Sequence, residues 1–581
     1  MQTAMQPVTP QQLVQDWRAQ LATADGAPGV DDYLRAWSDW WLGLAARPAQ
    51  QFALAQSALA AGADIWRFAM AAAAHALLHG DSPSHDHADS SFAGNSWNHW
   101  PFNIYACGHA HFKKLSVQAL AAGGDLSAEN ALRLEFLRRL CVDAASPAHY
   151  LLTNPELLAQ TGAEGGANLL RGAQYWLEDA ARMLGGGAAP GTENFRVGEQ
   201  VAATPGKVVM RNELVELIQY SPQGTNVFAE PVLITPAWIM KYYVLDLSPR
   251  NSLVQYLVGQ GHTVFMISWK NPTAAQRNLG MDDYVDLGLH AALDAVSAIV
   301  PGERIHTVGY CIGGTLLTIG AAHLTRTGDT RIASITLLAA QTDFSEPGEL
   351  AVFISPNQLA ALEAKMQRDG VLRSENMAAA FALLRASDLI WAPAINQYLR
   401  GQRAPLSDLM AWNADGTRMP CRMHSEYLTR LYLHNELSAG RFTVNDATVD
   451  LKALTVPMFA VGTETDHVAP WQSVFKTRAL TRSSDYSFVL TSGGHNAGIV
   501  SGPVNPKRRH GLLHWNSATT TTSPTEYLAG AEQRAGSWWP TWQQWLAARS
   551  AAARVAPPQM GNDTAGYPPL CDAPGGYVRD R

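Results

Sequence analysis

The chain has 581 residues, a formal net charge of −7, 47% hydrophobic residues and 16% charged residues. This length predicts two or more domains, and the composition is typical of a globular protein and excludes a disordered one. The negative charge argues against a general nucleic-acid surface, although it leaves open a local basic pocket for phosphates.

The cysteines and the N-terminal region indicate the cellular compartment. The five cysteines are scattered, odd in number and without metal-ligand spacing, which favours a reducing environment. The first seven residues lack the basic and apolar regions of a signal peptide. The alanine-rich stretch 52–78 is interrupted by Asp64 and Arg67, which makes it a poor transmembrane candidate. We therefore expect a cytoplasmic protein without a transmembrane segment.

Residues 11 to about 185 have the apolar spacing of helices. One predicted helix face, which we expect to form core rather than a ligand platform, carries Leu34, Trp37 and Trp41. Asn154-Pro155 opens a further helix. The glycine-rich stretch 185–191 is the best domain boundary in the chain.

One group of side chains in this helical part has the composition of a metal site. It comprises His85, Asp86, His87, Asp89 and His99. Serines and a proline surround most of the group, which is typical of a polar loop. We therefore expect no bound metal.

From about residue 207 the pattern changes to strands that alternate with helices. An antiparallel pair is predicted at 208–210 and 215–220, followed by apolar strands at 231–235, 262–268, 305–309 and 332–339. Helical segments lie between them at 251–259 and 281–300. Near-continuous apolar strands that alternate with helices indicate a doubly wound, mostly parallel sheet.

The segment Gly309-Tyr310-Cys311-Ile312-Gly313-Gly314 joins a predicted strand to a predicted helix. Its spacing is that of the nucleophile elbow of α/β-hydrolases, G-x-S-x-G, with cysteine in place of serine. Glycines are needed there because the apex residue is strained and larger side chains would collide with the flanking strand and helix. The helix N-terminus would favour a thiolate and an oxyanion. The alternative is a glycine-rich turn with a buried cysteine.

Two later strands supply the partners that such a nucleophile needs. The apolar run 456–462 leads into Asp466, and the run 487–491 leads into His495. Nucleophile, acid and histidine in this order, each after a strand, are typical of an α/β-hydrolase triad. We therefore predict that Cys311, Asp466 and His495 are catalytic. Between about 343 and 445 the alternation stops, and we expect a cap insertion there.

With these residues in place, the chain from about residue 89 to its end resembles the polyhydroxyalkanoate (poly-3-hydroxybutyrate) synthase family, single-chain short-acyl type. Besides the elbow, the matching motifs are Lys241–Leu247, Gly261–Trp269, Asp282–Tyr284, Asp388–Trp391, Trp412-Asn413, Asp466–Trp471, Gly494-His495, Gly536–Pro540 and Ala573–Val578. The helical part adds Asp89, Phe92, Trp97, Ser146-Pro147 and Thr153–Pro155. The chain departs from the family at Pro236–Met240, where P-P-C-I-N is usual, and at Ser501–Pro506.

The resemblance implies an architecture and an activity. It implies a helical N-terminal domain over residues 1–190, variable over 1–88 and synthase-like over 89–190, and an α/β-hydrolase domain over 200–581. The expected reaction polymerises (R)-3-hydroxyacyl-CoA, with 3-hydroxybutyryl-CoA as the expected substrate, through an acyl-cysteine. No cofactor is expected, because CoA is a product. A homodimer at the surface of polyester granules is also implied.

The expected mechanism assigns further residues to the site. His495 takes the proton of Cys311, and backbone N–H groups of Ile312 and of the Ala237–Trp238 region hold the oxyanion. The resemblance implies pocket roles for His467 and Trp412. Arg385 is a candidate contact for a CoA phosphate, with a solvated or structural arginine as the alternative.

Two other functions are weighed against polymer synthesis. A CoA thioesterase or polyester depolymerase would share the fold, but such hydrolases usually carry serine at the elbow. A non-catalytic granule-coating protein would be favoured by the loss of a site residue, and none of the three is lost. Aromatic residues such as Trp391, Trp412 and Tyr427 could wall a water-poor channel or form ordinary cap core; the resemblance favours synthesis.

Overall fold

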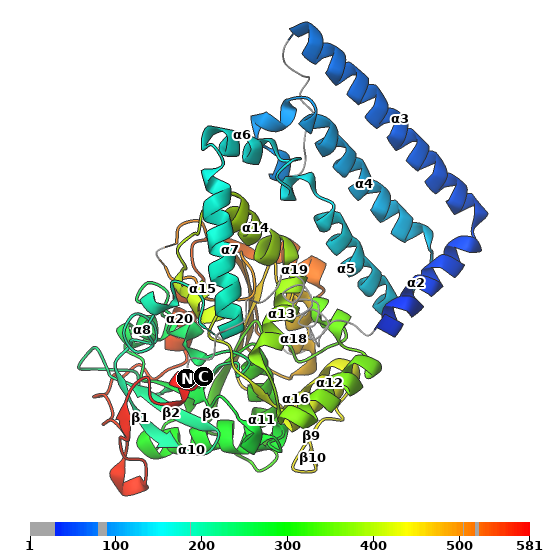
Figure 1. The fold of residues 1–581 in the computed structure, drawn as a ribbon. Coiled ribbons are helices and arrows are strands. Elements are labelled where there is room, and N and C mark those ends of the chain that lie inside the picture. The colour runs from blue at the N-terminus through cyan, green and yellow to red at the C-terminus, as the bar shows by residue number, and fades with distance from the viewer. Residues whose placement is uncertain (1–29, 80–89, 186, 504, 518–521) are drawn as a thin grey trace. The chain divides into compact units, whose positions relative to one another are not determined.

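The computed structural model describes residues 30–79, 90–185, 187–503, 505–517 and 522–581 (Figure 1). The chain divides into two compact units. We call the first, residues 1–189 with 379–405, the helical unit, and the second, residues 190–378 with 406–581, the sheet unit.

Within the described part of the N-terminal region, the helical unit contains six α-helices, and a short later segment of the chain joins them. They are α2 (Val30–Ala45), α3 (Pro48–His79), α4 (Phe102–Ala122), α5 (Ala128–Ala144), α6 (Pro155–Ala163) and α7 (Ala167–Gly185). Asn154 caps α6, because its side chain accepts hydrogen bonds from the N–H groups of Glu156 and Leu157. The predicted helix start at Asn154-Pro155 is therefore confirmed.

The predicted core face of α2 is wrong. Leu34, Trp37 and Trp41 are 56%, 53% and 57% exposed. The helix instead packs through Ala36 and Trp40, whose indole N–H donates to the carbonyl of Ala119 in α4 at 2.9 Å. Both stripes have helical spacing, and the stripe with the small residue allows the closer helix approach, so periodicity alone could not choose between them.

Residues 379–405 join the helical unit through α7. Their elements are the end of α13 (Ser374–Leu384), η9 (Ser387–Trp391), α14 (Ala392–Ala394) and η10 (Ile395–Leu399). Asn168 donates to the carbonyl of Leu399 at 2.8 Å. A Cβ on Gly172 would lie 1.9 Å from the carbonyl oxygen of Tyr398, so this contact requires glycine. The stretch expected to form one cap insertion, 343–445, is thus shared between the two units.

The sheet unit contains, among the described residues, one eleven-stranded sheet in the order β14-β13-β12-β11-β6-β5-β3-β4-β2-β1-β15. The six central strands run parallel: β4 (Val264–Trp269), β3 (Val232–Thr235), β5 (Ile305–Tyr310), β6 (Ile332–Leu338), β11 (Met458–Thr463) and β12 (Tyr486–Thr491). Antiparallel strands flank them: β13 (Arg509–Trp515) and β14 (Glu532–Ala535) at one edge, and β2 (Val215–Tyr220), β1 (Gly206–Arg211) and β15 (Cys571–Asp572) at the other. The expected mostly parallel sheet with an opening antiparallel pair is confirmed.

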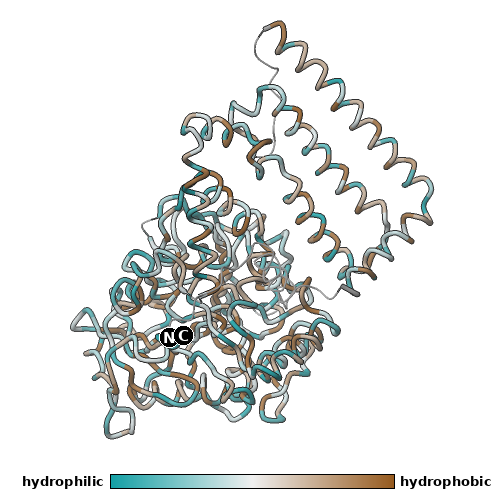
Figure 2. Tube along the Cα trace, viewed as in Figure 1, coloured by the Kyte–Doolittle hydropathy of each residue, from teal (hydrophilic) through white to brown (hydrophobic). Residues whose placement is uncertain are grey.

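Helices along the chain between the strands complete the core of the sheet unit. They include α8 (Leu253–Gly259), α9 (Met281–Asp283), η7 (Tyr284–His290), α10 (Ala291–Ile299), α11 (Ile312–Thr325), α17 (Trp471–Phe475), α18 (Thr477–Leu480) and α20 (Trp539–Ala547). Every residue of β3, β4, β5, β11 and β12 is buried, which explains why these strands read as nearly continuous apolar runs. Figure 2 shows brown, apolar stretches of chain within the sheet unit.

The remaining part of the expected cap that belongs to the sheet unit consists of short elements. They include η8 (Glu349–Phe353), α12 (Pro356–Asp369), β7 (Val371–Leu372), α15 (Asp408–Asn413), β8 (Met419–Pro420), α16 (Cys421–Glu426), η11 (Tyr427–Leu433), β9 (Thr443–Val444) and β10 (Ala447–Thr448). Among the described residues, no single helix has the length and apolar character of a membrane span, although the bent pair 374–384 and 387–399 passes that test when combined.

Candidate active site

Cys311 occupies a sharp turn between β5 and α11. Its φ of 53° lies in the left-handed region, and its N–H donates to the carbonyl of Leu338 on β6 at 2.9 Å. A Cβ on Gly309 would lie 2.3 Å from the Cα of Gly314, and one on Gly313 would lie 2.3 Å from the carbonyl oxygen of Thr235. The elbow therefore has the strained apex and the glycine-dependent packing that its sequence predicts.

Asp466 and His495 lie in the loops after β11 and β12, at the same edge of the sheet as the elbow. Parallel neighbouring strands place their carboxyl ends side by side. His495 Nδ1 is 2.8 Å from Asp466 Oδ2, and the side chain of His495 is close enough to Cys311 for the two to interact electrostatically. Because a carboxylate only accepts, Nδ1 donates to Asp466 and leaves Nε2 for the cysteine. The structure thus brings together the three residues predicted from the sequence.

Asp466 is held as a charged acceptor. Its Oδ1 accepts from the N–H groups of Val468 at 2.9 Å and Ala469 at 2.8 Å, while Oδ2 accepts from the hydroxyl of Thr463 at 2.9 Å as well as from His495. Burial tends to raise the pKa of Asp466, but the charge of His495 and these hydrogen bonds lower it below its usual value. The carboxylate therefore stays ionised inside the protein.

The imidazole of His495 responds to the same environment. Burial alone would lower its pKa, but the negative charges of Asp466 and of Cys311 outweigh that effect and raise the pKa of His495 well above its usual value. The side chain of Asp466 is 0% exposed and that of His495 is 14% exposed, so water screens their attraction poorly. The site favours an imidazolium beside the cysteine sulfur.

Two residues that support His495 were missed by the sequence analysis. The ring of Tyr310 lies 5.6 Å from that of His495, and its hydroxyl donates to Asn496 Oδ1 at 2.5 Å. Tyr310 is the residue before the nucleophile and Asn496 the residue after the histidine, so both adjoin motifs already identified. Their bond ties the elbow to the histidine loop.

The loop of residues 236–241 follows β3 and contains the predicted second oxyanion donor; we call it the β3 loop. Gly313 of the elbow packs against the backbone of Pro236. The indole of Trp269 donates to the carbonyl of Pro236 at 2.8 Å, and the hydroxyl of Thr417 donates to that of Trp238 at 2.6 Å. Gly313 lies in the first turn of α11, and Ile312 is the first residue of that helix, so its N–H has no acceptor within the helix.

The Trp238 side chain belongs to the core. It is 2% exposed and packs against Trp269 and Tyr284, with ring centroids 5.5 and 4.7 Å away. Its indole N–H finds no acceptor among the described residues. The side chain of Trp238 is therefore a core residue.

The structure gives the other three predicted residues different surroundings. His467 follows Asp466, and its Nδ1 lies 3.4 Å from a carboxylate oxygen of Glu349. Trp412 is 3% exposed, and its indole donates to the carbonyl of Lys241 at 2.8 Å. Arg385 belongs to the helical unit, where it pairs with Asp388 one turn away.

Two buried tyrosines of η11 lie near the nucleophile; the sequence analysis offered Tyr427 as a channel wall or cap core and gave Tyr432 no role. The hydroxyl of Tyr427 donates to that of Tyr432 at 3.3 Å. Burial raises the pKa of both phenols, and the negative charge of Cys311 adds to the effect. Both hydroxyls therefore stay neutral beside the thiol. Their spacing within an aromatic segment was the only signal available in the sequence.

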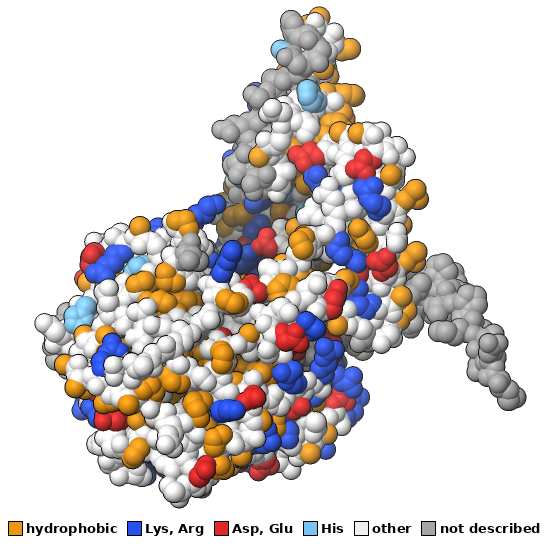
Figure 3. All heavy atoms as spheres, turned by 90° about the vertical axis from the view of Figure 1, so that its left-hand side faces the viewer, with side chains coloured by type: hydrophobic (Ala, Val, Ile, Leu, Met, Phe, Trp, Pro, Cys, Tyr) orange, Lys and Arg blue, Asp and Glu red, His pale blue; other side chains and the backbone are white. Residues whose placement is uncertain are grey.

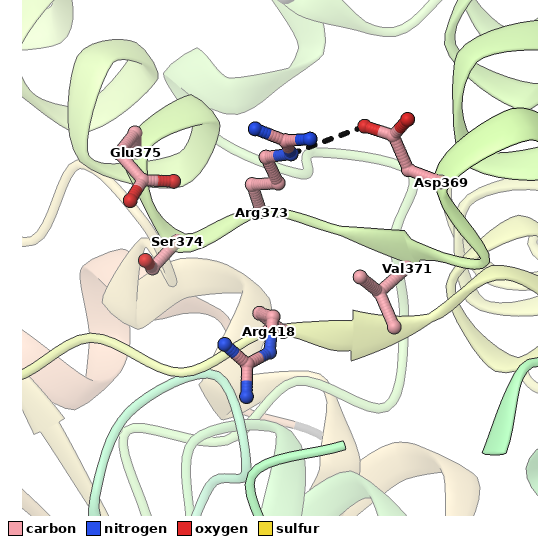
Figure 4. A pocket seen from close by; sticks show the side chains of 6 residues that line it. All are labelled: Asp369, Val371, Arg373, Ser374, Glu375 and Arg418. Carbon is pink, nitrogen blue, oxygen red and sulfur yellow. Dashed lines mark hydrogen bonds and ion pairs between the residues drawn. The ribbon is translucent and has the colours of Figure 1, made fainter. Parts of the chain in front are cut away.

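A hollow of about 350 Å³ lies elsewhere in the sheet unit (Figure 4). It is lined by Asp369, Val371, Arg373, Ser374, Glu375 and Arg418. Arg373 pairs with Asp369 at 3.1 Å, so the two arginines and two acids balance in charge. None of the three central residues lines it. Within the described residues no group of His, Cys, Asp and Glu could hold a metal; residues 85–89 lie outside them.

Comparison with known proteins identifies the family of this chain. The family model for the poly-beta-hydroxybutyrate polymerase (PhaC) N-terminus matches residues 88–257, and that of the alpha/beta hydrolase fold matches residues 230–501. The chain is 39% identical over 496 residues to the poly(3-hydroxyalkanoate) polymerase of Methylorubrum extorquens, covering 84% of this chain and 80% of that protein. The chain belongs to this polymerase family.

A second relative supports the assignment over more of the chain. The poly(3-hydroxyalkanoate) polymerase subunit PhaC of Cupriavidus necator is 35% identical over 570 residues, which cover 96% of this chain and 92% of the relative. The family resemblance inferred from the motifs is confirmed, and so is the prediction of an acyltransferase with an α/β-hydrolase fold.

Proposed function

We propose that this polymerase transfers (R)-3-hydroxyacyl units, with 3-hydroxybutyryl-CoA as the substrate, to a growing polyester and releases CoA. The observation that carries the proposal is the Cys311–His495–Asp466 arrangement, with the 2.8 Å contact between His495 Nδ1 and Asp466 Oδ2. The short acyl chain is proposed from the sequence resemblance to the single-chain, short-acyl branch. An acyl-cysteine is the intermediate.

In the first half-reaction His495 Nε2 accepts the proton of Cys311, and the sulfur attacks the thioester carbonyl carbon. The tetrahedral intermediate collapses, the carbon–sulfur bond to CoA breaks, and the imidazolium returns its proton to the leaving thiolate. A cysteine suits this step because exchange between two thioesters is nearly balanced. An ester of serine would lie much lower in free energy than a thioester and would be a poorer intermediate for acyl transfer.

In the second half-reaction a hydroxyl group attacks the acyl-cysteine. His495 accepts the hydroxyl proton, the new ester bond forms, and Cys311 leaves as a thiolate. Asp466 holds the imidazole in the tautomer that exposes Nε2 and stabilises its charged form. The family resemblance also suggests that Asp466 helps to activate the incoming hydroxyl.

Both half-reactions pass through an oxyanion. We propose that the N–H of Ile312 and an N–H of the β3 loop near Trp238 bind it, each donor contributing about 2.7–4 kcal/mol. The support is the packing of Gly313 against Thr235 and Pro236, which brings the first turn of α11 close to that loop. Because both donors are backbone groups, the unusual Pro236–Met240 sequence can retain this role.

Polymer synthesis requires that a substrate hydroxyl, and not water, reaches the acyl-cysteine. The nearly complete burial of Asp466 and His495 and the two neutral phenols of Tyr427 and Tyr432 support such a dry site. A thioesterase would begin with the same acyl-cysteine, so the triad does not distinguish the two. The family membership favours polymer synthesis.

The three remaining predicted residues receive different roles. We propose that His467, which is half-buried next to Asp466, lines the substrate entrance. Trp412 is buried and bonded to Lys241, which supports a role in holding the β3 loop rather than in touching substrate. Arg385 stays a candidate contact for a CoA phosphate, in competition with its pairing to Asp388.

We further propose that the cytoplasmic enzyme works at the surface of the polyester it makes. In the helical unit, α3 carries an exposed apolar stripe of Phe52, Leu59, Trp66, Met70 and Leu77. On another face of the protein, hydrophobic side chains are interspersed with charged ones (Figure 3). The only charged residues of α3, Asp64 and Arg67, pair with each other. An uncharged apolar stripe suits an uncharged polyester. A homodimer is proposed from the family resemblance and is tested by light scattering.

One assay tests the proposed function. The purified protein is incubated with 3-hydroxybutyryl-CoA while CoA release and turbidity are followed together. We expect CoA release to be accompanied by insoluble polyester. Stoichiometric free 3-hydroxybutyrate without polymer would support the thioesterase instead, and no CoA release from folded protein would exclude both enzymes.

A further inference from the structure

We propose that residues 575–581, which we call the strap, position the β3 loop through Lys241 and thereby set the second oxyanion donor. The inference rests on the proposed function, since it assigns the strap and Lys241 as positioning elements for that reaction. The strap follows β15, the edge strand beside β1, and the red end of the chain runs along this edge (Figure 1).

One end of the strap is fastened to a buried carboxylate of β2. Glu216 is 0% exposed, and its Oε2 accepts from the N–H groups of Gly576 at 2.9 Å and Tyr577 at 3.0 Å. Arg211 balances its charge at 2.6 Å. The hydroxyl of Tyr577 adds a bond of 2.6 Å to the carbonyl of Asn212. Hydrogen bonds to a buried carboxylate are among the stronger ones in proteins, so this end is firmly held.

The other end of the strap holds Lys241, the last residue of the β3 loop. Lys241 is 3% exposed, and its ammonium donates to the carbonyl oxygens of Asp580 at 2.6 Å and Tyr577 at 3.5 Å. The strap is steadied there by Asn271, which donates to the Asp580 carbonyl at 3.3 Å, and by Arg418, which donates to the Arg581 carbonyl at 3.1 Å. A buried ammonium needs such acceptors, so Lys241 and the strap depend on each other.

Hydrogen bonds therefore hold the β3 loop on both sides of the proposed donor. Trp269 holds Pro236 on one side, and on the other side the strap holds the Lys241 ammonium while Trp412 holds its carbonyl. The backbone near Trp238 lies between these points. An oxyanion donor acts only within a narrow range of distance, and a displacement of about 1 Å can lower a rate about 100-fold. Loss of the strap contact should therefore appear in the chemical step.

The test compares two variants with a matched control. Lys241→Met removes the ammonium but keeps the length of the side chain, and Glu216→Gln weakens the distant end of the strap without touching the β3 loop. The control is Gln219→Leu. Gln219 lies on the same strand as Glu216 and is also buried, and it makes two hydrogen bonds to residues 559 and 561, before β15. The Gln219→Leu substitution therefore removes contacts to the segment before β15 but leaves the contacts of the strap in place.

For each variant we would measure kcat and KM for CoA release, the rate of Cys311 alkylation by iodoacetamide, and the melting temperature. Alkylation at a saturated carbon develops no oxyanion, so it reports the thiolate but not the donor. We expect Lys241→Met and Glu216→Gln to lower kcat about 10- to 100-fold with alkylation unchanged. Their double variant should lose no more than the worse single one, because both act through the strap. Gln219→Leu should lower only the melting temperature.

Three results would overturn the inference. The first is a wild-type kcat in both strap variants. If Lys241→Met does not fold, a wild-type kcat in Glu216→Gln alone overturns the inference. The second is a parallel fall of kcat and alkylation in all variants, which is a general loss of structure. The third is a wild-type protein that is alkylated at Cys311 but releases no CoA, which would refute the proposed function and the inference with it.

Discussion

Asp466→Asn is the most discriminating change in the triad, because the surrounding donors dictate how the amide must sit. Oδ1 of Asp466 accepts from the N–H groups of Val468 and Ala469 at 2.9 and 2.8 Å. An NH₂ group in that place would face two donors, so the amide oxygen must take it. The NH₂ group then replaces Oδ2 and points at His495 Nδ1, which lies 2.8 Å away in the wild type.

This geometry reverses the tautomer of the base. An NH₂ group can only donate to Nδ1, so the imidazole proton moves to Nε2, where the lone pair is needed to accept the proton of Cys311. The corresponding change in a Ser-His-Asp triad lowers kcat by about 10⁴. We expect a similar loss here, which is about 5 kcal/mol of transition-state stabilisation. The variant should still fold to the same structure, since the shape and the two backbone hydrogen bonds are kept, although the loss of the ion pair lowers its stability.

The assay is the initial rate of CoA release from 3-hydroxybutyryl-CoA, with circular dichroism and a melting curve for each protein. Asp246→Asn is the control, because Asp246 is a buried aspartate that accepts from Ser252 at 2.7 Å outside the site. It should change stability while leaving the rate within about tenfold of the wild type. A rate for Asp466→Asn within the same tenfold range would refute the tautomer argument.

Four further outcomes are expected. Cys311→Ala should fold and lose CoA release, and substantial residual turnover would remove Cys311 as the acyl carrier. His495→Ala should be about as damaging as Cys311→Ala, whereas a larger loss in His467→Ala would reassign the base. Gly172→Ala should lower the melting temperature of the helical unit, because the added Cβ would lie 1.9 Å from a backbone carbonyl oxygen; an unchanged melting temperature would contradict that contact. The stability difference between wild type and Asp466→Asn, measured by urea unfolding, should be greatest between about pH 4 and 6.5.

The pH window follows from the directions of the two shifts. The pKa of Asp466 is lowered in the folded protein, so its contribution is complete above the unfolded value of about 3.9 and is lost as the pH falls through the folded value. The pKa of His495 is raised, so its contribution is complete below about 6.5 and is lost as the pH rises through the folded value. A difference that does not vary with pH would contradict the ion pair.

Much of the catalytic unit could be predicted from the sequence because its signals are local. The elbow joins strand, nucleophile and helix within a few residues, and its glycines are required by contacts of the turn itself. Asp466 and His495 each follow a strand that is buried on both faces and therefore reads as an apolar run. Parallel strands then bring these loop residues together at one edge of the sheet, so their order along the chain was enough to predict the site.

The remaining features depend on contacts between residues that are far apart in the chain. Helical periodicity could not show that α2 packs through Ala36 and Trp40, because both of its stripes are apolar. No residue near Gly172 in the sequence indicates that a backbone carbonyl more than two hundred residues away packs against this glycine. Likewise, the buried ammonium of Lys241 donates a hydrogen bond to the backbone carbonyl of Asp580, which is distant in the sequence. Such contacts leave no periodic or local pattern, and only the tertiary structure decides them.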